Sequence, residues 1–221
     1  MNIRNHFPTE ELQKRDAAHH LHPFSAQDDL AKKGSKIITS AQGVYVFDSN
    51  GEQILDAMAG LWCVNIGYGR EELAQAAQRQ MRELPYYNTF FQTTHIPAID
   101  LSEKLAQLAP RDLNHVFYAG SGSEANDTNI RIVRQYWASL GYSEKNIIIS
   151  RKNAYHGSTL GGASLGGMSA MHKQGGLPIP DVYHINQPDW WAEGGELNPE
   201  DFGLARAREL EVAILELGDK R

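Results

Sequence analysis

The period of the hydrophobic positions changes along the chain. In "IITSAQGVYVFDSNGEQILDA", apolar residues alternate with polar ones on both sides of Ser49-Asn50-Gly51. Alternation with a period of two is typical of half-buried strands, and Asn-Gly is a favoured turn between antiparallel strands. The pattern therefore predicts a β-hairpin, preceded by a polar N-terminal arm that runs to about Lys36.

Two segments after the hairpin show helical spacing. Apolar residues recur every three or four positions in "EELAQAAQRQMREL" and in the segment opened by Pro97. These positions are Leu73, Ala77, Met81 and Leu84 in the first segment, and Leu101, Leu105 and Leu108 in the second. Both segments are predicted to be amphipathic helices.

Strands and helices alternate from residue 116 onward. Apolar runs predict strands at 116–119, 146–150 and 182–185, and helical spacing predicts helices at 124–140 and from about Pro199. This order is typical of a parallel α/β sheet. We therefore predict an α/β fold, and the chain ends where another strand is expected.

Composition and charge narrow the classes of function. The 221 residues carry a net charge of −6 and are 41% hydrophobic, which is ordinary for a globular chain and offers no basic surface for nucleic acid or an anionic membrane. No apolar run approaches the roughly 18 residues of a membrane-spanning helix. The N-terminus "MNIRNHFPTEELQKRD" is too polar for a signal peptide. We predict a cytoplasmic protein that binds neither nucleic acid nor membrane.

Cysteine and histidine usage gives little chemistry. The single Cys63 cannot form an internal disulfide and is predicted to be a small buried side chain. His19, His20 and His22 suggest a metal site, but no carboxylate or cysteine spacing accompanies them. We therefore predict no metal site, and we expect a solvated arm that leads into Phe24.

The "GSGS" turn at residues 120–123 lies between a predicted strand and a helix. Glycines let the backbone approach a ligand closely, and a helix start offers unpaired N–H groups, so the turn suits a phosphate. Ser121 and Glu124 also fit a capping box that merely starts the helix. "GSGSEA" further matches a relaxed dinucleotide pattern, for which Arg151 and Lys152 favour NADP over NAD.

The second informative stretch is "RKNAYHGSTLGGASLGGM". Tyr155 and His156 lie in the loop beyond the carboxyl end of a predicted strand, where open α/β sheets bind ligands. An aromatic face beside the phosphate turn would suit a flat phosphorylated cofactor. Taken alone, such a pair in a loop is more often ordinary surface packing.

Four stretches together resemble one family. "LDAMAGLWCVNIGYG", "PYYNTFFQTTH", "YAGSGSEANDT" and "NAYHGST" are similar to the class III (omega) aminotransferases, a branch of the fold-type I pyridoxal-phosphate enzymes, and above all to bacterial members that use amines or putrescine with pyruvate. The resemblance implies that residues 1–60 are the arm and hairpin segment of a small domain. It implies that residues 61–221 begin the large cofactor-binding α/β domain.

The resemblance also implies roles for particular residues. Ser121, Gly122 and Ser123 would bind the phosphate of pyridoxal 5'-phosphate, Tyr155 would stack on its ring, and His156 would support the placement of the ring or a carboxylate. Four aromatic residues would bind substrate or approach the neighbouring subunit's site: Phe24, Trp62, Phe90 and Phe91. The implied assembly is a homodimer with active sites at the interface, or a tetramer formed by two such dimers.

The catalytic lysine of the family has no match in this chain. The resemblance puts it after Arg221, so no catalytic residue is expected here and the chain would be the N-terminal half of a longer enzyme. With its C-terminal remainder as partner, it would transfer the amino group of an amine or diamine to a keto acid such as pyruvate. The alternatives are an inactive cofactor- or nucleotide-binding fragment and an NADP-dependent oxidoreductase built on "GSGSEA".

Overall fold

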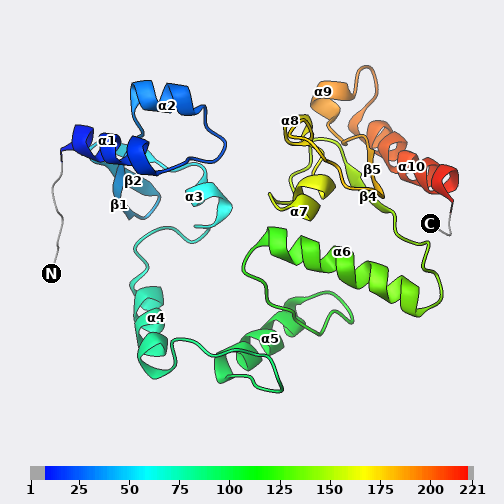
Figure 1. Cartoon of the computed structure of the whole chain (residues 1–221), viewed down its shortest axis with the longest axis horizontal. Helices are drawn as coiled ribbons and strands as arrows, with labels where there is room; N and C mark the ends of the chain where they lie inside the picture. The colour runs from blue at the N-terminus through cyan, green and yellow to red at the C-terminus, as the bar shows by residue number, and fades with distance from the viewer. Residues whose placement is uncertain (1–7, 219–221) are drawn as a thin grey trace. The chain divides into compact units, whose positions relative to one another are not determined.

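The computed structural model describes residues 8–218, and the chain divides into two compact units, Met1–Ala98 and Ile99–Arg221 (Figure 1). Each unit contains its own sheet, which is antiparallel in the first and parallel in the second. The family resemblance implies a domain boundary at residue 60. This boundary stays a prediction, because it concerns the domains of the complete protein. None of the helices in residues 8–218 is long and apolar enough to cross a membrane.

The N-terminal arm contains two helices, α1 (Thr9–His19) and α2 (Gln27–Lys33). Acidic residues lie in the first turn of both helices and basic residues in the last turn. These charged side chains interact favourably with the helix dipole. Neither helix has a buried residue. The hydrophobic pattern missed them because they have no apolar stripe.

The predicted hairpin is confirmed and extended to three strands. β1 (Ile38–Gln42), β2 (Tyr45–Asp48) and β3 (Gln53–Leu55) pair in the order β1-β2-β3. Asp48 is only 5% exposed. Its Oδ1 accepts the backbone N–H of Asn50 at 2.9 Å and that of Glu52 at 2.8 Å. One buried carboxylate thus closes the turn between β2 and β3.

Three helices follow in the chain: α3 (Ala59–Trp62), α4 (Glu71–Glu83) and α5 (Ile96–Leu108). The last two confirm the amphipathic helices predicted from spacing. The first is a short, irregular turn that no periodicity could have indicated. Cys63, at its end, is exposed and donates its Sγ–H to the carbonyl of Gly60 at 2.9 Å, so the prediction of a buried cysteine was wrong.

The second unit has the predicted parallel α/β arrangement. Its elements are α6 (Gly122–Ser139), β4 (Ile148–Arg151), α7 (Leu160–Leu165), α8 (Ser169–His172), β5 (Val182–Ile185), α9 (Trp190–Glu193) and α10 (Pro199–Leu217). β4 and β5 pair in parallel, with Ile148 opposite Val182. α7 contacts both α6 and β4, and α10 packs beside β5 (Figure 1).

The strand predicted at residues 116–119 is absent. This segment has no regular structure, and Phe117 in it is 71% exposed. A strand needs a hydrogen-bonded neighbour, and no segment within residues 8–218 pairs with this one. The apolar run was identified correctly, but the assignment as a strand was wrong for the described chain.

The hydrophobic core lies in the second unit. The buried apolar residues in the described part of the chain are Ile130, Ala163, Met171, Ile185, Phe202 and Ala213. They come from α6, α7, α8, β5 and α10, so the helices pack around the parallel pair of strands. This core holds in place the start of α6 and the loop after β4.

Candidate functional site

The "GSGS" turn forms the start of α6. Ser121 is the N-cap residue, and its Oγ accepts the N–H of Glu124 at 3.1 Å. The Glu124 carboxylate in turn accepts the N–H of Gly120 at 2.6 Å. The Ser121 half of the capping box therefore exists, whereas the Glu124 carboxylate binds the N–H of the residue before the N-cap. This arrangement leaves the backbone amides of Gly122 and Ser123 without a recorded acceptor among residues 8–218, so capping and ligand binding are compatible.

The loop that follows β4 is hydrogen-bonded to this helix start. The N–H of Ser158 donates to Oγ of Ser123 at 3.1 Å. The side-chain amide of Asn126 donates to the carbonyl of His156 at 2.7 Å. The two stretches that the sequence analysis singled out are thus joined side by side in the second unit.

Asp127 adds a third link. Its Oδ1 accepts the hydroxyl of Thr159 at 2.8 Å and the N–H of Gly162 at 3.1 Å. Sequence reasoning missed both Asn126 and Asp127. The available signal was their spacing, because residues three and four positions after Ser123 share its face of the helix.

Two glycines allow the close approach of loop and helix. Gly157 is buried with a φ of 122°, and a Cβ on it would lie 2.3 Å from Oγ of Ser123. A Cβ on Gly161 would lie 2.3 Å from Oδ1 of Asp127. Any larger residue at these two positions would push the loop away from α6.

Tyr155 and His156 lie at the exposed edge of this loop. Both side chains are exposed, and the backbone of His156 is fixed by its hydrogen bond to Asn126. Behind the loop, Nε2–H groups of His172 and His184 each donate to the carbonyl of Gly166 at 2.8 Å. The segment is therefore held from two sides, while its aromatic face points away from the core.

The four aromatic residues assigned to substrate belong to the first unit. Phe24, Trp62, Phe90 and Phe91 are all exposed, Trp62 to 86% and Phe91 to 94%. Phe24, Trp62 and Phe91 also have positive φ values, of 50°, 66° and 55°. Left-handed backbone is costly for such residues and concentrates at functional sites.

Asp56 holds the turn that carries Trp62. Its carboxylate accepts the N–H of Gly60 at 2.7 Å and the hydroxyl of Tyr68 at 2.7 Å. The hydrogen bond from Tyr68 lowers the pKa of Asp56 and raises the pKa of Tyr68 itself. A Cβ on Gly60 would lie 2.7 Å from a methyl group of Val64, so the turn is tight. Sequence reasoning identified neither Asp56 nor Tyr68.

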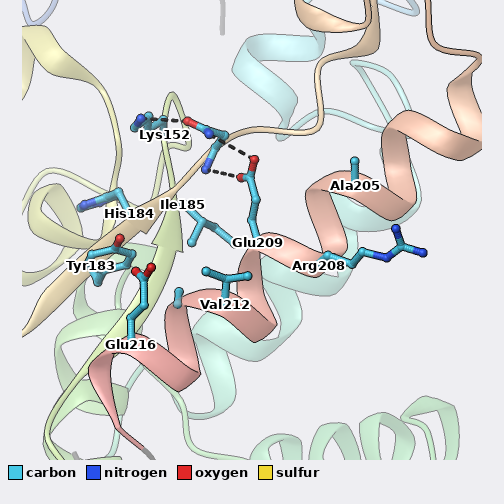
Figure 2. A pocket seen from close by; sticks show the side chains of 11 residues that line it. Lys152, Tyr183, His184, Ile185, Ala205, Arg208, Glu209, Val212 and Glu216 are labelled. Atoms are coloured by element: carbon cyan, nitrogen blue, oxygen red, sulfur yellow. Dashed lines mark hydrogen bonds between the residues drawn. The ribbon is translucent and has the colours of Figure 1, made fainter.

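A separate cavity of about 440 Å³ lies between β5 and α10 (Figure 2). Lys152 donates to Oδ1 of Asn186 at 2.8 Å, and the Asn186 amide donates to Glu209 at 3.3 Å. None of the residues predicted to bind cofactor or substrate lines this cavity. Lys152 is thus engaged in a hydrogen-bond network with Asn186 and Glu209.

The histidines near the N-terminus have an acidic neighbour after all. Asp16 lies 3.0 Å from Nδ1 of His20 and 2.8 Å from Nε2 of His22. The expectation that no carboxylate accompanies these histidines was therefore wrong. The spacing D-x-x-x-H-x-H at the end of a helix was the missed signal, because positions i and i+4 of a helix are neighbours.

Comparison with known proteins identifies the family. The model for class III aminotransferases matches residues 29–214. The chain is 58% identical over 212 residues to putrescine–pyruvate aminotransferase of Pseudomonas aeruginosa. The aligned region covers 96% of this chain and 46% of that protein. It is 41% identical over 201 residues to a probable γ-aminobutyrate transaminase of Oryza sativa subsp. indica, covering 90% of the chain and 40% of the relative.

Solved structures agree with the sequence comparison. An (S)-enantioselective omega-transaminase from Thermomicrobium roseum superimposes with a TM-score of 0.91 at 38% identity, over 97% of this chain and 47% of that one. An omega-transaminase from Pseudomonas jessenii, in complex with PMP, superimposes with a TM-score of 0.90 at 38% identity. The match covers 95% of this chain and 46% of that one. The chain spans about half the length of the curated relatives it matches. With the fold-type I α/β architecture confirmed in this way, the chain belongs to the class III aminotransferase family.

Proposed function

We propose that this chain supplies the cofactor-phosphate and ring-stacking half of a pyridoxal-phosphate-dependent transaminase active site. The observation that carries the proposal is the hydrogen-bonded unit formed by the start of α6 and the loop after β4. The reaction would transfer the amino group of an amine or diamine to a keto acid such as pyruvate. The 58% identity to a putrescine–pyruvate aminotransferase supports this choice of substrates.

The residues of the "GSGS" turn fit a phosphate group. The amides of Gly122 and Ser123 stand at the positive end of the 18-residue α6, and no atom lies within 4 Å of a Cβ built on Gly122. Oγ of Ser121 and Oγ of Ser123 each accept a backbone N–H, so each hydroxyl keeps its proton to donate. Amides and hydroxyls together could satisfy several phosphate oxygens.

Tyr155 and His156 would position the cofactor ring. The aromatic face of Tyr155 is exposed in the loop that Asn126 and Asp127 fasten to α6. Stacking there would fix the ring relative to the phosphate anchor, which is how protein groups orient a cofactor. When bound, pyridoxal phosphate supplies an electron-withdrawing ring and the carbonyl carbon that accepts the amine nitrogen. His156 would support the edge of the ring or a substrate carboxylate.

The remainder of the protein would supply the catalytic lysine, and activity would require it. Large side chains that a complete enzyme would cover are exposed here, among them Phe117, Ile132 and Tyr136 in the second unit. Exposed apolar surface of this kind marks contact with further protein. We propose that the C-terminal remainder and a second copy of the enzyme cover it, giving a homodimer or a tetramer formed by two such dimers.

Phe24, Trp62, Phe90 and Phe91 would bind the substrate at or near the dimer interface. Their exposure and the strained backbone of three of them support this role. The cytoplasmic location stays a prediction. The NADP interpretation of "GSGSEA" is not retained, because the relatives named above are aminotransferases.

Absorption spectroscopy of the purified protein tests the function. A visible band of bound cofactor that disappears on adding putrescine and returns with pyruvate is the expected result. Tyr155→Ala should weaken retention of the cofactor and slow the half-reaction, while Tyr155→Phe, which keeps the aromatic face, should retain most of both. Equal half-reaction rates in Tyr155→Ala and the natural protein would refute the stacking role. A protein that binds no added pyridoxal phosphate would refute the cofactor assignment.

A further inference from the structure

We propose that Asp16, His20 and His22 form a binding site for one divalent transition-metal ion, with Zn²⁺ the best match. Their ligand atoms all lie within 4.8 Å of one another. Two imidazole nitrogens and one carboxylate oxygen are a common donor set for zinc, whereas calcium and magnesium prefer oxygen ligands alone. The proposal concerns the first unit and does not depend on the transaminase assignment.

The distances match those around a single small ion. Zinc bonds to nitrogen and oxygen at roughly 2.0–2.2 Å, so two ligands of one tetrahedral ion stand about 3.3 Å apart. Nδ1 of His20 lies 3.0 Å and Nε2 of His22 lies 2.8 Å from separate oxygens of Asp16. The ligand atoms, now within 4.8 Å of one another, would close around the ion, with the proton of each imidazole on its other nitrogen.

The ligands come from one short, already ordered segment. Asp16 and His20 are one helical turn apart at the end of α1, and the N–H of His20 donates to the carbonyl of Asp16 at 2.8 Å. The rings of His20 and His22 have centroids 4.1 Å apart. Because the arrangement exists without an ion, little ordering would oppose binding.

Exposure and surroundings also suit an ion. The side chains of Asp16 and His22 are only 17% and 21% exposed, while His20 is 61% exposed and leaves a route for the ion and for a water ligand. The buried hydroxyl of Ser35 completes no hydrogen bond of good geometry among residues 8–218. It nevertheless lies close enough to Asp16 to interact with its carboxylate. Ser35 could therefore orient this ligand, as groups behind metal ligands do.

Occupancy would act on the segment that carries Phe24. His22 is followed by Pro23 and by Phe24, whose φ is 50°. The carbonyl of His22 accepts the side chain of Gln27 at 2.7 Å, which ties this segment to α2. An ion on His22 would add a second tie, to the end of α1. The site would therefore stiffen the turn that presents Phe24.

Metal titration of the full-length, tag-free enzyme tests the proposal. Isothermal titration with ZnCl₂ should give one high-affinity ion per chain and a higher thermal unfolding midpoint. Asp16→Asn and His22→Gln should each weaken the affinity at least about 10-fold, the scale on which metal sites respond to altered ligands and supports. His19→Gln, which changes the neighbouring histidine outside the cluster, should bind zinc as the natural protein does.

Cobalt gives an independent readout. Co²⁺ at the site should show the visible absorption of a four-coordinate ion, and this absorption should vanish in His22→Gln. If His22→Gln fails to fold, as judged by circular dichroism, His20→Gln decides, because that side chain is largely exposed. No zinc binding, or binding that is unchanged in His20→Gln and His22→Gln, would show that the cluster is only a hydrogen-bonded helix end.

Discussion

The carboxylate of Asp127 accepts the hydroxyl of Thr159 at 2.8 Å and so ties α6 to the loop that follows β4. The same oxygen also accepts the N–H of Gly162 at 3.1 Å. Thr159 is the N-cap residue of α7, and its own Oγ accepts the N–H of Gly162. One side chain of α6 thus fixes the start of α7, and with it the loop that carries Tyr155.

Removing this carboxylate should loosen the loop. In Asp127→Ala the hydroxyl of Thr159 and the N–H of Gly162 lose a half-buried acceptor, which should lower the free energy of unfolding by about 1–3 kcal/mol. Affinity for pyridoxal phosphate should fall as well, because the loop that carries Tyr155 loses one of its hydrogen-bonded links to α6. Asp127→Asn keeps an acceptor oxygen and is the control. Urea unfolding and cofactor titration measure the two effects, and an alanine variant equal to the natural protein in both would contradict the role.

Replacement of Gly157 should be more damaging than replacement of a glycine with open surroundings. Gly157 and Gly141 both have positive φ values, but only Gly157 would bring a Cβ against Ser123. Gly141→Ala should cost about 1 kcal/mol for left-handed backbone. Gly157→Ala should cost about 1–3 kcal/mol more, because the side chain overpacks a tight contact. Urea midpoints compare the two variants, and equal losses would mean that the loop moves away from Ser123 without cost.

Local patterns predicted most of the fold. The helices at Glu71–Glu83 and Pro199–Leu217 have apolar residues at helical spacing, and the hairpin has its Asn-Gly turn, so each is determined by nearby residues. The prediction of a strand at residues 116–119 was wrong because a strand is defined by its hydrogen-bonded neighbour, which no local pattern contains. α1 and α2 were missed because their sequences are polar and have no apolar stripe to detect.

The candidate site also has some contacts that local spacing predicts and others that depend on packing between distant segments. Ser121 and Glu124 could be predicted to pair, because a capping box has a fixed spacing. The contact of Ser123 with Ser158 spans 35 positions and depends on how α6 packs against the loop. The group of Asp16, His20 and His22 is local, because Asp16 lies one helical turn before His20, so the sequence did contain the signal for it.

Substitutions of Ser121 can separate capping from phosphate binding. Its Oγ accepts the N–H of Glu124 and so stabilises the start of α6. Ser121→Ala should lower stability by about 1 kcal/mol, whereas Ser121→Gly, which is tolerated as a cap, should cost only a few tenths. Both variants lack the hydroxyl and should lose the same affinity for pyridoxal phosphate. Cofactor affinity that follows helix stability instead would show that Ser121 acts only as a cap.

The link between Asp56 and Tyr68 should give stability a defined dependence on pH. The hydrogen bond from Tyr68 lowers the pKa of Asp56 below its ordinary 3.8, so this contribution is present above that pH and is lost as pH falls through the folded-state pKa. The pKa of Tyr68 is raised above its ordinary 10.0, so the contribution is also full below pH 10.0 and is lost as pH rises through the higher folded-state value.

Tyr68→Phe should therefore lower the urea midpoint by a constant amount between these two pH values and by less outside them. Tyr87→Phe, at an exposed tyrosine of the same unit, is the control and should leave the midpoint unchanged at every pH. The loss should extend to the turn that carries Trp62, because Asp56 also accepts the N–H of Gly60. Faster quenching of tryptophan fluorescence in Tyr68→Phe than in Tyr87→Phe would show that the turn carrying Trp62 is looser. Midpoint curves of Tyr68→Phe and the natural protein that stay parallel below pH 3.8 would mean that the contribution of the hydrogen bond does not depend on ionisation of Asp56.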